Sequence, residues 1–376
     1  MKSTIYFDNA ATTALAPEVA EAMLPYLNEH YGNPSSIYSL GRDTRAAIET
    51  ARKLIAQILN AQTSEIIFTS CGTEANNMAI KGAVIYHQVK RIITSPIEHH
   101  CVLHIADYLE QYHQVKIEYV QLLPDGMIDL ENLSSLLKND DTKTLVSLMY
   151  ANNEIGNLLD IKKVSRICKE NNALFHSDTV QAFGHFPIDV QAVDVDYLSA
   201  SAHKFHGPKG IGFLYQKKKN RVASLLHGGG QERGYRAGTE NVYGIVGLAK
   251  ATEIAYQNLE KDSQYIQSVK DYFKEQLTSN FQDIQFNGNA KHSLFTVLNV
   301  SFPSNPLADM LLFNLDIEGV CASGGSACNS GASTGSHVIQ AIQPNTNRHN
   351  IRFSFSKYNK KEEVDYVIQI LKKYFS

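Results

Sequence analysis

Short apolar runs alternate along the chain with longer stretches that mix apolar and polar residues. Runs of β-branched and apolar residues of strand length predict buried strands, and stretches of mixed residues between them have helical patterns. The predicted strands are 66–69, 91–94, 144–148, 173–176 and 211–215, and the predicted helices are 73–83, 99–112, 161–171 and 179–183. This strand–helix–strand order predicts a parallel sheet that is covered by helices on both faces.

The pattern changes after about residue 245. A long polar helix over 245–279 is followed by a strand at 295–302, a helix from Leu307, a Gly/Ser loop at 323–335, a strand at 351–355 and a last helix from Lys361. This order is typical of a small α+β unit. We therefore predict a large domain over residues 15–250 and a small domain formed by residues 1–14 and 251–376.

Composition excludes several classes of protein. The 376 residues are 43% hydrophobic and 19% charged, and 35 basic against 38 acidic residues give a net charge of −3, which does not favour a nucleic-acid partner. We find no apolar stretch of the ~20 residues that a membrane span needs, and no signal peptide. The five cysteines are scattered and lack a CxxC pair, which argues against disulfides and a zinc ribbon. We therefore expect a cytoplasmic protein that acts without nucleic acid or membrane.

Candidate chemistry follows the predicted strands, because the carboxyl ends of strands carry the sites in such sheets. After 66–69, Gly72 and Thr73 open a helix whose free N–H groups suit a phosphate, although a simple helix cap is the more frequent explanation of such a turn. Asp178 follows 173–176, and Lys204 stands downstream beside His203 and Ser201. A pyridoxal phosphate (PLP) site needs such an acid and such a lysine. A capping aspartate and a surface lysine would give the same spacing.

Longer segments decide between these alternatives. The segment 199–210, SASAHKFHGPKG, resembles the lysine segment of the NifS/IscS-type cysteine desulfurases, which are fold type I PLP enzymes of the class V aminotransferase family. Nine further matches follow in the family's order along essentially the whole chain: DNAATT (8–13), GNPSS (32–36), FTSCGTE (68–74), EHH (98–100), NNEIG (152–156), HSDTVQ (176–181), RAGTEN (236–241), GSAC (325–328) and IRFS (351–354). The resemblance implies a seven-stranded, mostly parallel sheet and a smaller α+β C-terminal domain.

The resemblance also implies the residues that bind PLP. Lys204 matches the lysine that joins the cofactor covalently, Asp178 the partner of its ring nitrogen, and Gln181 the partner of its phenolate oxygen. His99 matches the imidazole that stacks on the ring and handles protons. Further matches to cofactor ligands are Gly72, Thr73, Ser201, His203 and Asn153, together with Thr239, which the family contributes from the second subunit of a homodimer.

For the substrate, the resemblance implies that L-cysteine is bound through its carboxylate. Arg352 and Asn153 match the carboxylate site, where a guanidinium offers two parallel donors. Asn33 matches the lining of the same pocket.

Cys328 matches the nucleophile of the family. It lies in a Gly/Ser-rich segment, and the resemblance implies that it takes the substrate sulfur as a persulfide, releases L-alanine and presents the sulfur to an acceptor. We expect Cys71, Cys101 and Cys168 to be small core residues and Cys321 to end a buried strand.

The chain departs from the family pattern around the nucleophile. The usual Leu-Glu-Pro-Ser-His reads Ser-Thr-Gly-Ser-His at 333–337, and the usual Ser-Gly-His-Lys reads Ser-Ala-His-Lys at 201–204. The sequence ends at Ser376 soon after the last predicted helix, whereas relatives that dock an iron–sulfur scaffold carry a further tail. We therefore hypothesise that the sulfur acceptor is a tRNA 2-thiouridylase in preference to an iron–sulfur scaffold.

Two other functions fit part of the pattern. An aminotransferase or a selenocysteine lyase would share Lys204 and Asp178 but would need no mobile thiol. A metal-binding protein could use His100 and His104, which have the i,i+4 spacing of a metal pair, but the sequence offers no obvious third ligand. We therefore predict an enzyme without a metal site.

Overall fold

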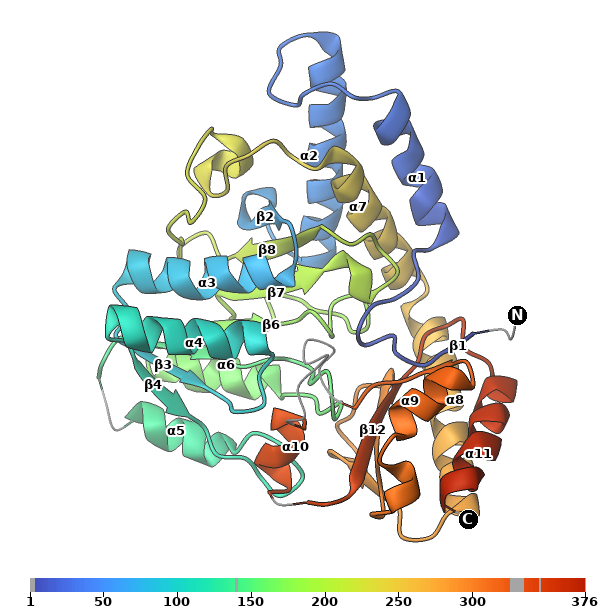
Figure 1. Cartoon of the computed structure of the whole chain (residues 1–376). Helices are drawn as coiled ribbons and strands as arrows, with labels where there is room; N and C mark the ends of the chain where they lie inside the picture. The colour runs from blue at the N-terminus through green and yellow to red at the C-terminus, as the bar shows by residue number, and fades with distance from the viewer. Residues whose placement is uncertain (1–3, 139–140, 325–334, 345, 376) are drawn as a thin grey trace.

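A seven-stranded sheet forms the centre of the protein. The computed structural model describes residues 4–138, 141–324, 335–344 and 346–375 (Figure 1). The strand order is β2-β8-β7-β6-β5-β3-β4. Their bounds are β2 Ile66–Thr69, β3 Arg91–Thr94, β4 Lys116–Tyr119, β5 Thr144–Ser147, β6 Leu174–Asp178, β7 Tyr197–Ser201 and β8 Gly212–Gln216.

All of these strands run in one direction except β8, which is antiparallel to both β2 and β7. The predicted mostly parallel sheet is thus confirmed, but a parallel orientation for 211–215 is wrong. The connection from Ser201 to Gly212 is shorter than the dozen or more residues that a parallel crossover requires, so the chain turns back. Gly210 supports the turn with a φ of +79°.

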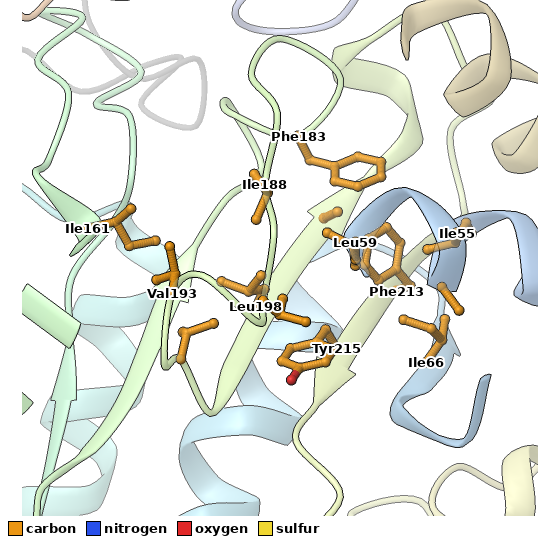
Figure 2. Close-up of a cluster of buried hydrophobic side chains, with 14 of the residues drawn as sticks. Ile55, Leu59, Ile66, Ile161, Phe183, Ile188, Val193, Leu198, Phe213 and Tyr215 are labelled. Carbon is orange, nitrogen blue, oxygen red and sulfur yellow. The ribbon is translucent and has the colours of Figure 1, made fainter. Parts of the chain in front are cut away.

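Alternate side chains of the strands serve two different cores, as expected for a sheet buried on both faces. Leu198, Phe213 and Tyr215 belong to the core shared with helix α2 (Ser39–Leu59), whereas Tyr197 and Leu214 belong to the core shared with helices α3 (Gly72–His87) and α4 (His100–His113). Figure 2 shows the first core, where Ile55 and Leu59 of α2 lie near Phe213 and Ile66. This packing makes the sheet a rigid support for residues at its edge.

Helices cover the sheet in two layers (Figure 1). The core with α3 and α4 lies on one face, and the core that includes α2 and α7 lies on the other. The helices of this part are α1 Pro17–Asn28, α2 Ser39–Leu59, α3 Gly72–His87, α4 His100–His113, α5 Leu130–Lys138, α6 Ile161–Glu170 and α7 Val242–Gln257.

The C-terminal part has its own core. Its antiparallel sheet has the order β12-β10-β9, and a short parallel pair joins β1 to β11. Ile5 and Phe7 from the N-terminus pack into this core with residues of α8 and α11. The elements are β1 Ile5–Tyr6, α8 Leu259–Asn280, β9 Gln285–Asn287, β10 Val297–Phe302, α9 Leu311–Ile317, β11 Val320–Cys321, α10 His337–Ile342, β12 His349–Ser354 and α11 Lys361–Phe375. The separate core agrees with the predicted small domain, whose boundaries stay a prediction.

Three local predictions are wrong. Residues 179–183 form turns and no helix. Thr179 O accepts hydrogen bonds from Ala182 N and Phe183 N, as in a helix, but Gly184 then has a φ of +83°, which ends the helical course of the chain. The helix over 245–279 is two helices, α7 and α8, which meet at Asn258, whose side chain bonds back to Ile254 O. The helix from Leu307 is a 3₁₀ turn over Pro306–Ala308 followed by the short α9.

The carboxyl ends of β2, β3, β5, β6 and β7 lie at one edge of the sheet, because these strands share one direction. The residues that follow them therefore meet at that edge. Among the described residues, no helix is long and apolar enough to cross a lipid bilayer.

Candidate active site

A cavity of about 240 Å³ opens at the carboxyl edge of the sheet. It brings together side chains that are far apart in the sequence, from the ends of five strands and from β12 of the C-terminal sheet. The predicted site residues that line it are Gly72, Thr73, His99, Asn153, Asp178, Gln181, Ser201, His203, Lys204 and Arg352.

Lys204 reaches the cavity from a 3₁₀ turn, Ala202–Lys204, that directly follows β7. Its ammonium donates to Ala10 O over 2.7 Å and to Ala11 O over 2.8 Å. Gln181 also donates to Ala10 O, over 2.9 Å. The N-terminal segment therefore holds the lysine at the cavity wall through hydrogen bonds to main-chain oxygens. These bonds do not modify the amine, which can still react.

Asp178 ends β6 with its carboxylate buried. Burial raises the pKa of this carboxyl, and hydrogen bonds from the Val180 main chain and the Asn76 amide oppose that shift. The bonds are 2.9 Å from Val180 N to Oδ1 and 2.7 Å from Asn76 Nδ2 to Oδ2. The two donors favour the charged form, the form that pairs with a protonated ring nitrogen.

His99 lies at the N-terminus of α4, where its Nδ1 accepts from Cys101 N over 3.2 Å. Burial, and then the nearby positive charge of Lys204, lower the pKa of His99 to about 4. The imidazole is therefore neutral at physiological pH, with its proton on Nε2 because Nδ1 accepts. It can stack on an aromatic ring and take up a proton.

The start of α3 forms a second wall of the cavity. Gly72 lies so close to Val180 that a Cβ at residue 72 would come within 2.5 Å of Val180 Cγ2. A glycine is required there, and the first N–H groups of α3 have no partner within the helix. Ser201 Oγ is buried and has no hydrogen-bond partner among the described residues.

His203 completes this side of the cavity. Its Nδ1 lies 3.1 Å from Thr12 Oγ1. Burial and then the charge of Lys204 lower the pKa of His203 to about 4, so it is a neutral hydrogen-bonding group.

Arg352 enters the cavity from β12 and is 1% exposed. Its guanidinium donates to Asn153 O over 2.9 Å and to Asp8 Oδ1 over 2.6 Å. Its Nε is buried without a partner among the described residues. A buried donor of this kind is costly unless a ligand satisfies it, and a carboxylate is the natural acceptor.

Three predicted residues are not part of this cavity. Asn33 is exposed, and its Oδ1 accepts from Ser35 N over 2.9 Å. Thr239 lines a separate cavity of about 130 Å³ beside Arg236 and Gly238. Cys328 lies outside the described residues.

Several residues of the cavity were not recognised in the sequence. Asn76 lies four residues after Gly72 on the same helix face, a spacing that could have revealed it. Cys71 and Cys101 line the cavity, so the expectation of simple core positions is wrong for Cys71 and incomplete for Cys101, which also packs against a core. Cys168 is in the core as expected.

The predicted histidine pair of α4 has a third neighbour. The ring of His100 lies 5.3 Å from that of His104 and 4.4 Å from that of His337, measured between centroids. In the part of the chain that the structure describes, no three His, Cys, Asp or Glu side chains are arranged to hold a metal ion.

Comparison with known proteins identifies the family. Residues 5–367 match the family model described as aminotransferase class-V. The chain belongs to the class V aminotransferase family. It is 45% identical to a cysteine desulfurase IscS of Dictyoglomus turgidum over 99% of this chain and 95% of that protein. It is 44% identical to a cysteine desulfurase IscS of Methanosarcina thermophila over 98% of this chain and 91% of that protein. The solved structure of a NifS-like protein matches with a TM-score of 0.90 at 38% identity and covers 98% of both chains.

Membership of this class V family implies PLP as the cofactor, and the residues present fit it. The cavity offers an amine at Lys204, a buried carboxylate at Asp178, and the unsatisfied Ser201 hydroxyl near a helix N-terminus that requires glycine. These groups match the aldehyde, the ring nitrogen and the phosphate of PLP in chemical type.

Proposed function

We propose that this cysteine desulfurase holds L-cysteine between Lys204 and Arg352 and transfers its sulfur to Cys328. The observation that carries this proposal is the convergence of Lys204, Asp178 and Arg352 on one cavity from the large sheet and the C-terminal sheet. An amine, a carboxylate and a guanidinium serve a cofactor aldehyde, a ring nitrogen and an amino-acid carboxylate respectively.

The cofactor is held by residues of the large sheet. Lys204 would form its covalent link, Asp178 would pair with the ring nitrogen and Gln181 would hydrogen-bond to the phenolate oxygen. The phosphate is held by Gly72, Thr73, Ser201 and His203. When bound, the cofactor stabilises negative charge that develops on the substrate.

Arg352 and Asn153 orient the substrate. Asn153 O and Asp8 each accept from one Nη of the guanidinium, which leaves the buried Nε–H and a second N–H on each Nη as donors for the substrate carboxylate. Because Arg352 is rigidly held, little side-chain entropy is lost when L-cysteine binds. Asn33 contributes to the same pocket in this proposal.

Proton transfer involves two groups. The Lys204 amine would act as the base for the α-proton of the substrate. His99 is neutral because of burial and the nearby lysine, so this imidazole donates a hydrogen bond through Nε2 and takes up a proton only at Nδ1.

Both flanks of the segment 325–334 are attached near the cavity, which supports the role of Cys328. On one side, Ser323 and Arg352 exchange main-chain hydrogen bonds of 3.2 and 2.6 Å. On the other side, Ser336 donates to the Glu154 carboxylate, and His337 Nε2 donates to Glu98 O over 2.9 Å. Cys328 lies five positions after Ser323, so an extended chain between them spans at most about 18 Å.

The sulfur transfer balances without another reactant. The Cys328 thiolate forms a bond to the substrate sulfur, and the bond between that sulfur and the β-carbon breaks. The β-carbon keeps the electron pair and takes a proton, so the organic product is L-alanine and the sulfur remains on Cys328 as a persulfide.

A single-turnover measurement tests this function. Holoenzyme mixed with L-cysteine in the absence of a reductant should release one L-alanine for each Cys328 peptide that gains one sulfur atom in mass spectrometry. The Cys328→Ser variant should bind PLP and L-cysteine but form no persulfide, whereas Cys321→Ser, at the end of β11, should behave like the unmodified enzyme. Alanine formation at an unchanged rate by Cys328→Ser would refute the role of Cys328.

The enzyme acts as a homodimer in this proposal. Thr239 lies outside the cavity of its own chain, as expected for a residue that serves the site of a second subunit. Near the N-terminus, α1 and the turn after it expose Leu24, Leu27, Tyr31 and Ile37, and the exposed fraction of Ile37 reaches 90%. Exposed apolar patches of this kind mark surfaces that a partner covers.

The sulfur acceptor is a protein with a reactive thiol, and we propose that it docks on α9. Leu307, Met310, Phe313 and Ile317 are between 56% and 69% exposed, and the last three share one face of the helix. The patch lies at the start of the Cys328 segment, because the backbone at Gly324 rests against Leu312 of α9. A tRNA 2-thiouridylase and an iron–sulfur scaffold are the two candidate acceptors.

The protein works in the cytoplasm in this proposal, because persulfide transfer needs reduced thiols. The four described cysteines are free.

A further inference from the structure

A buried chain of hydrogen bonds leads away from Asp178 into the large sheet. Asn76 of α3 donates from Nδ2 to Asp178 Oδ2 over 2.7 Å, and its Oδ1 lies 3.1 Å from His176 Nε2. His176 Nδ1 in turn lies 2.9 Å from Ser147 Oγ. Asn76, His176 and Ser147 are each 0% exposed.

The sheet itself brings these groups together. His176 and Asp178 are two residues apart on β6, so their side chains are on the same face. Ser147 of β5 pairs with His176 in the register of the parallel ladder. Asn76 then bridges the two β6 side chains from the covering helix. None of these residues except Asp178 belongs to the proposed roles above.

The direction of the hydrogen bonds follows from the charge of Asp178. A carboxylate only accepts, so Asn76 must present its NH₂ group to Asp178 and its oxygen to His176. His176 must then donate from Nε2, which leaves Nδ1 to accept from the Ser147 hydroxyl. Burial lowers the pKa of His176 to about 3, so the imidazole is neutral and carries its one ring hydrogen on Nε2 when Asp178 is ionised.

The opposite direction of the same chain requires a protonated Asp178. With the Asn76 amide turned round, its oxygen would face Asp178 Oδ2, and only a neutral acid could donate to it. That arrangement also requires the other tautomer of His176, with Nδ1 donating to Ser147 Oγ, because with the hydrogen on Nε2 two donors would face each other across the bond. The Nε2–H tautomer of His176 and the ionised carboxylate therefore stabilise each other.

We propose that His176 is a positioning residue for Asp178: through Asn76, it keeps the carboxylate ionised and oriented toward the ring nitrogen of PLP. The inference rests on the proposed pairing of Asp178 with that nitrogen. A packing role alone would explain the burial of His176 but not the matched order of donors and acceptors that ends on the carboxylate.

A cofactor analogue separates these two roles. PLP and 1-deaza-PLP, in which carbon replaces the ring nitrogen, differ only in the group that Asp178 meets. The ratio of their dissociation constants, measured by titrating the apoenzyme, therefore reports the Asp178–nitrogen interaction and cancels general damage to the cavity. The variants to compare are His176→Leu, His176→Gln, Asn76→Ala and Asp178→Asn.

We expect the unmodified protein to prefer PLP and Asp178→Asn to lose that preference. His176→Leu should reduce it about tenfold, the scale of one hydrogen bond, here the bond that orients Asn76 toward the carboxylate. His176→Gln should retain most of it, because the glutamine amide can donate near the position of Nε2. Ser177→Ala, which removes a buried hydroxyl without a described partner on the same strand, is the matched control and should leave the ratio unchanged.

The result can overturn the proposal in separable ways. An equal loss of affinity for both cofactors in His176→Leu would reduce His176 to a packing residue. An unchanged ratio in both His176→Leu and Asn76→Ala would also refute the proposal, and Asn76→Ala alone decides it if the leucine variant does not fold. If the unmodified protein shows no preference, the role of Asp178 fails first, and the inference fails with it.

Discussion

Arg352 Nη2 lies 2.6 Å from Asp8 Oδ1, so the N-terminal segment holds the guanidinium that the C-terminal sheet contributes to the cavity. The same segment supplies Ala10 O and Ala11 O to Lys204. Residues 8–11 therefore connect the proposed substrate site with the proposed cofactor site. The position of one depends on the other, because both are attached to a single short stretch of chain.

Replacing Arg352 tests the substrate site. Arg352→Lys keeps the charge but removes the planar fork and the buried Nε donor, so we expect the KM for L-cysteine to rise at least about tenfold. PLP affinity should change little, since no cofactor contact is removed. Arg348→Lys is the control, because Arg348 bonds to Asp283 and Ser301 outside the cavity. Steady-state kinetics of both variants check this prediction, and an unchanged KM in Arg352→Lys would contradict it.

Lys204 should be the residue that holds the cofactor covalently. Borohydride reduction of the holoenzyme, followed by peptide mapping, should place the cofactor label on the peptide that contains Lys204. Lys204→Ala should show neither the label nor turnover. Lys209→Ala, five residues further along and exposed, should keep both. A label on any other lysine would show that the assignment is wrong.

Much of the site could be predicted because parallel strands place their carboxyl ends together. Asp178 and Ser201 end β6 and β7, and Gly72 follows β2, so local patterns and strand order were enough to bring them to one edge. The chemical roles came from the family resemblance, since spacing alone left Asp178 and Lys204 ambiguous.

Other features depend on contacts that no local pattern contains. The bonds from Lys204 to Ala10 and Ala11 join residues more than 190 positions apart. The reversal of β8 depends on the length of a connection, and the break between α7 and α8 depends on one asparagine that bonds back to its own helix. The link from Asn76 to His176 needs a helix and a strand to be packed together before it exists.

Subunit mixing tests the shared site. Lys204→Ala lacks the covalent anchor, and Thr239→Trp should damage the neighbouring site by bulk, so each homodimer should be inactive. A mixed dimer contains one site with both Lys204 and Thr239 intact. After subunit exchange, each mixed dimer should therefore have up to about half of the activity of an unmodified dimer. Exchange must be verified independently, for example by mass spectrometry of the intact dimer. Verified exchange without recovery would exclude a site shared in this way.

The α9 patch should govern sulfur delivery without governing sulfur removal. Phe313→Asp places a charge in the middle of the exposed apolar face, so we expect labelled-sulfur transfer from Cys328 to an acceptor protein to slow at least about tenfold. Turnover with a small thiol reductant should be unchanged, because it needs no docking. Tyr112→Asp is the control, because Tyr112 is an exposed residue of a different helix, α4. If Phe313→Asp transfers sulfur to both candidate acceptors as fast as the unmodified enzyme does, the acceptors do not dock on α9.

Glu98 should make the stability of the protein fall as the pH rises. Burial raises the pKa of Glu98 from 4.5 to about 8, while Met149 N and Ser95 Oγ donate to its Oε1. Between these pH values, the folded state keeps a proton that the unfolded state releases. The free energy of unfolding therefore decreases with increasing pH, by at most about 1.4 kcal/mol per pH unit from this group.

Glu98→Gln keeps an acceptor oxygen but does not titrate, so its stability relative to the unmodified protein should increase steadily from pH 5 to pH 8. Urea unfolding across this range checks the slope, with Glu110→Gln on the exposed face of α4 as the control. Parallel pH profiles for Glu98→Gln and the unmodified protein would mean that Glu98 is ionised in the folded state.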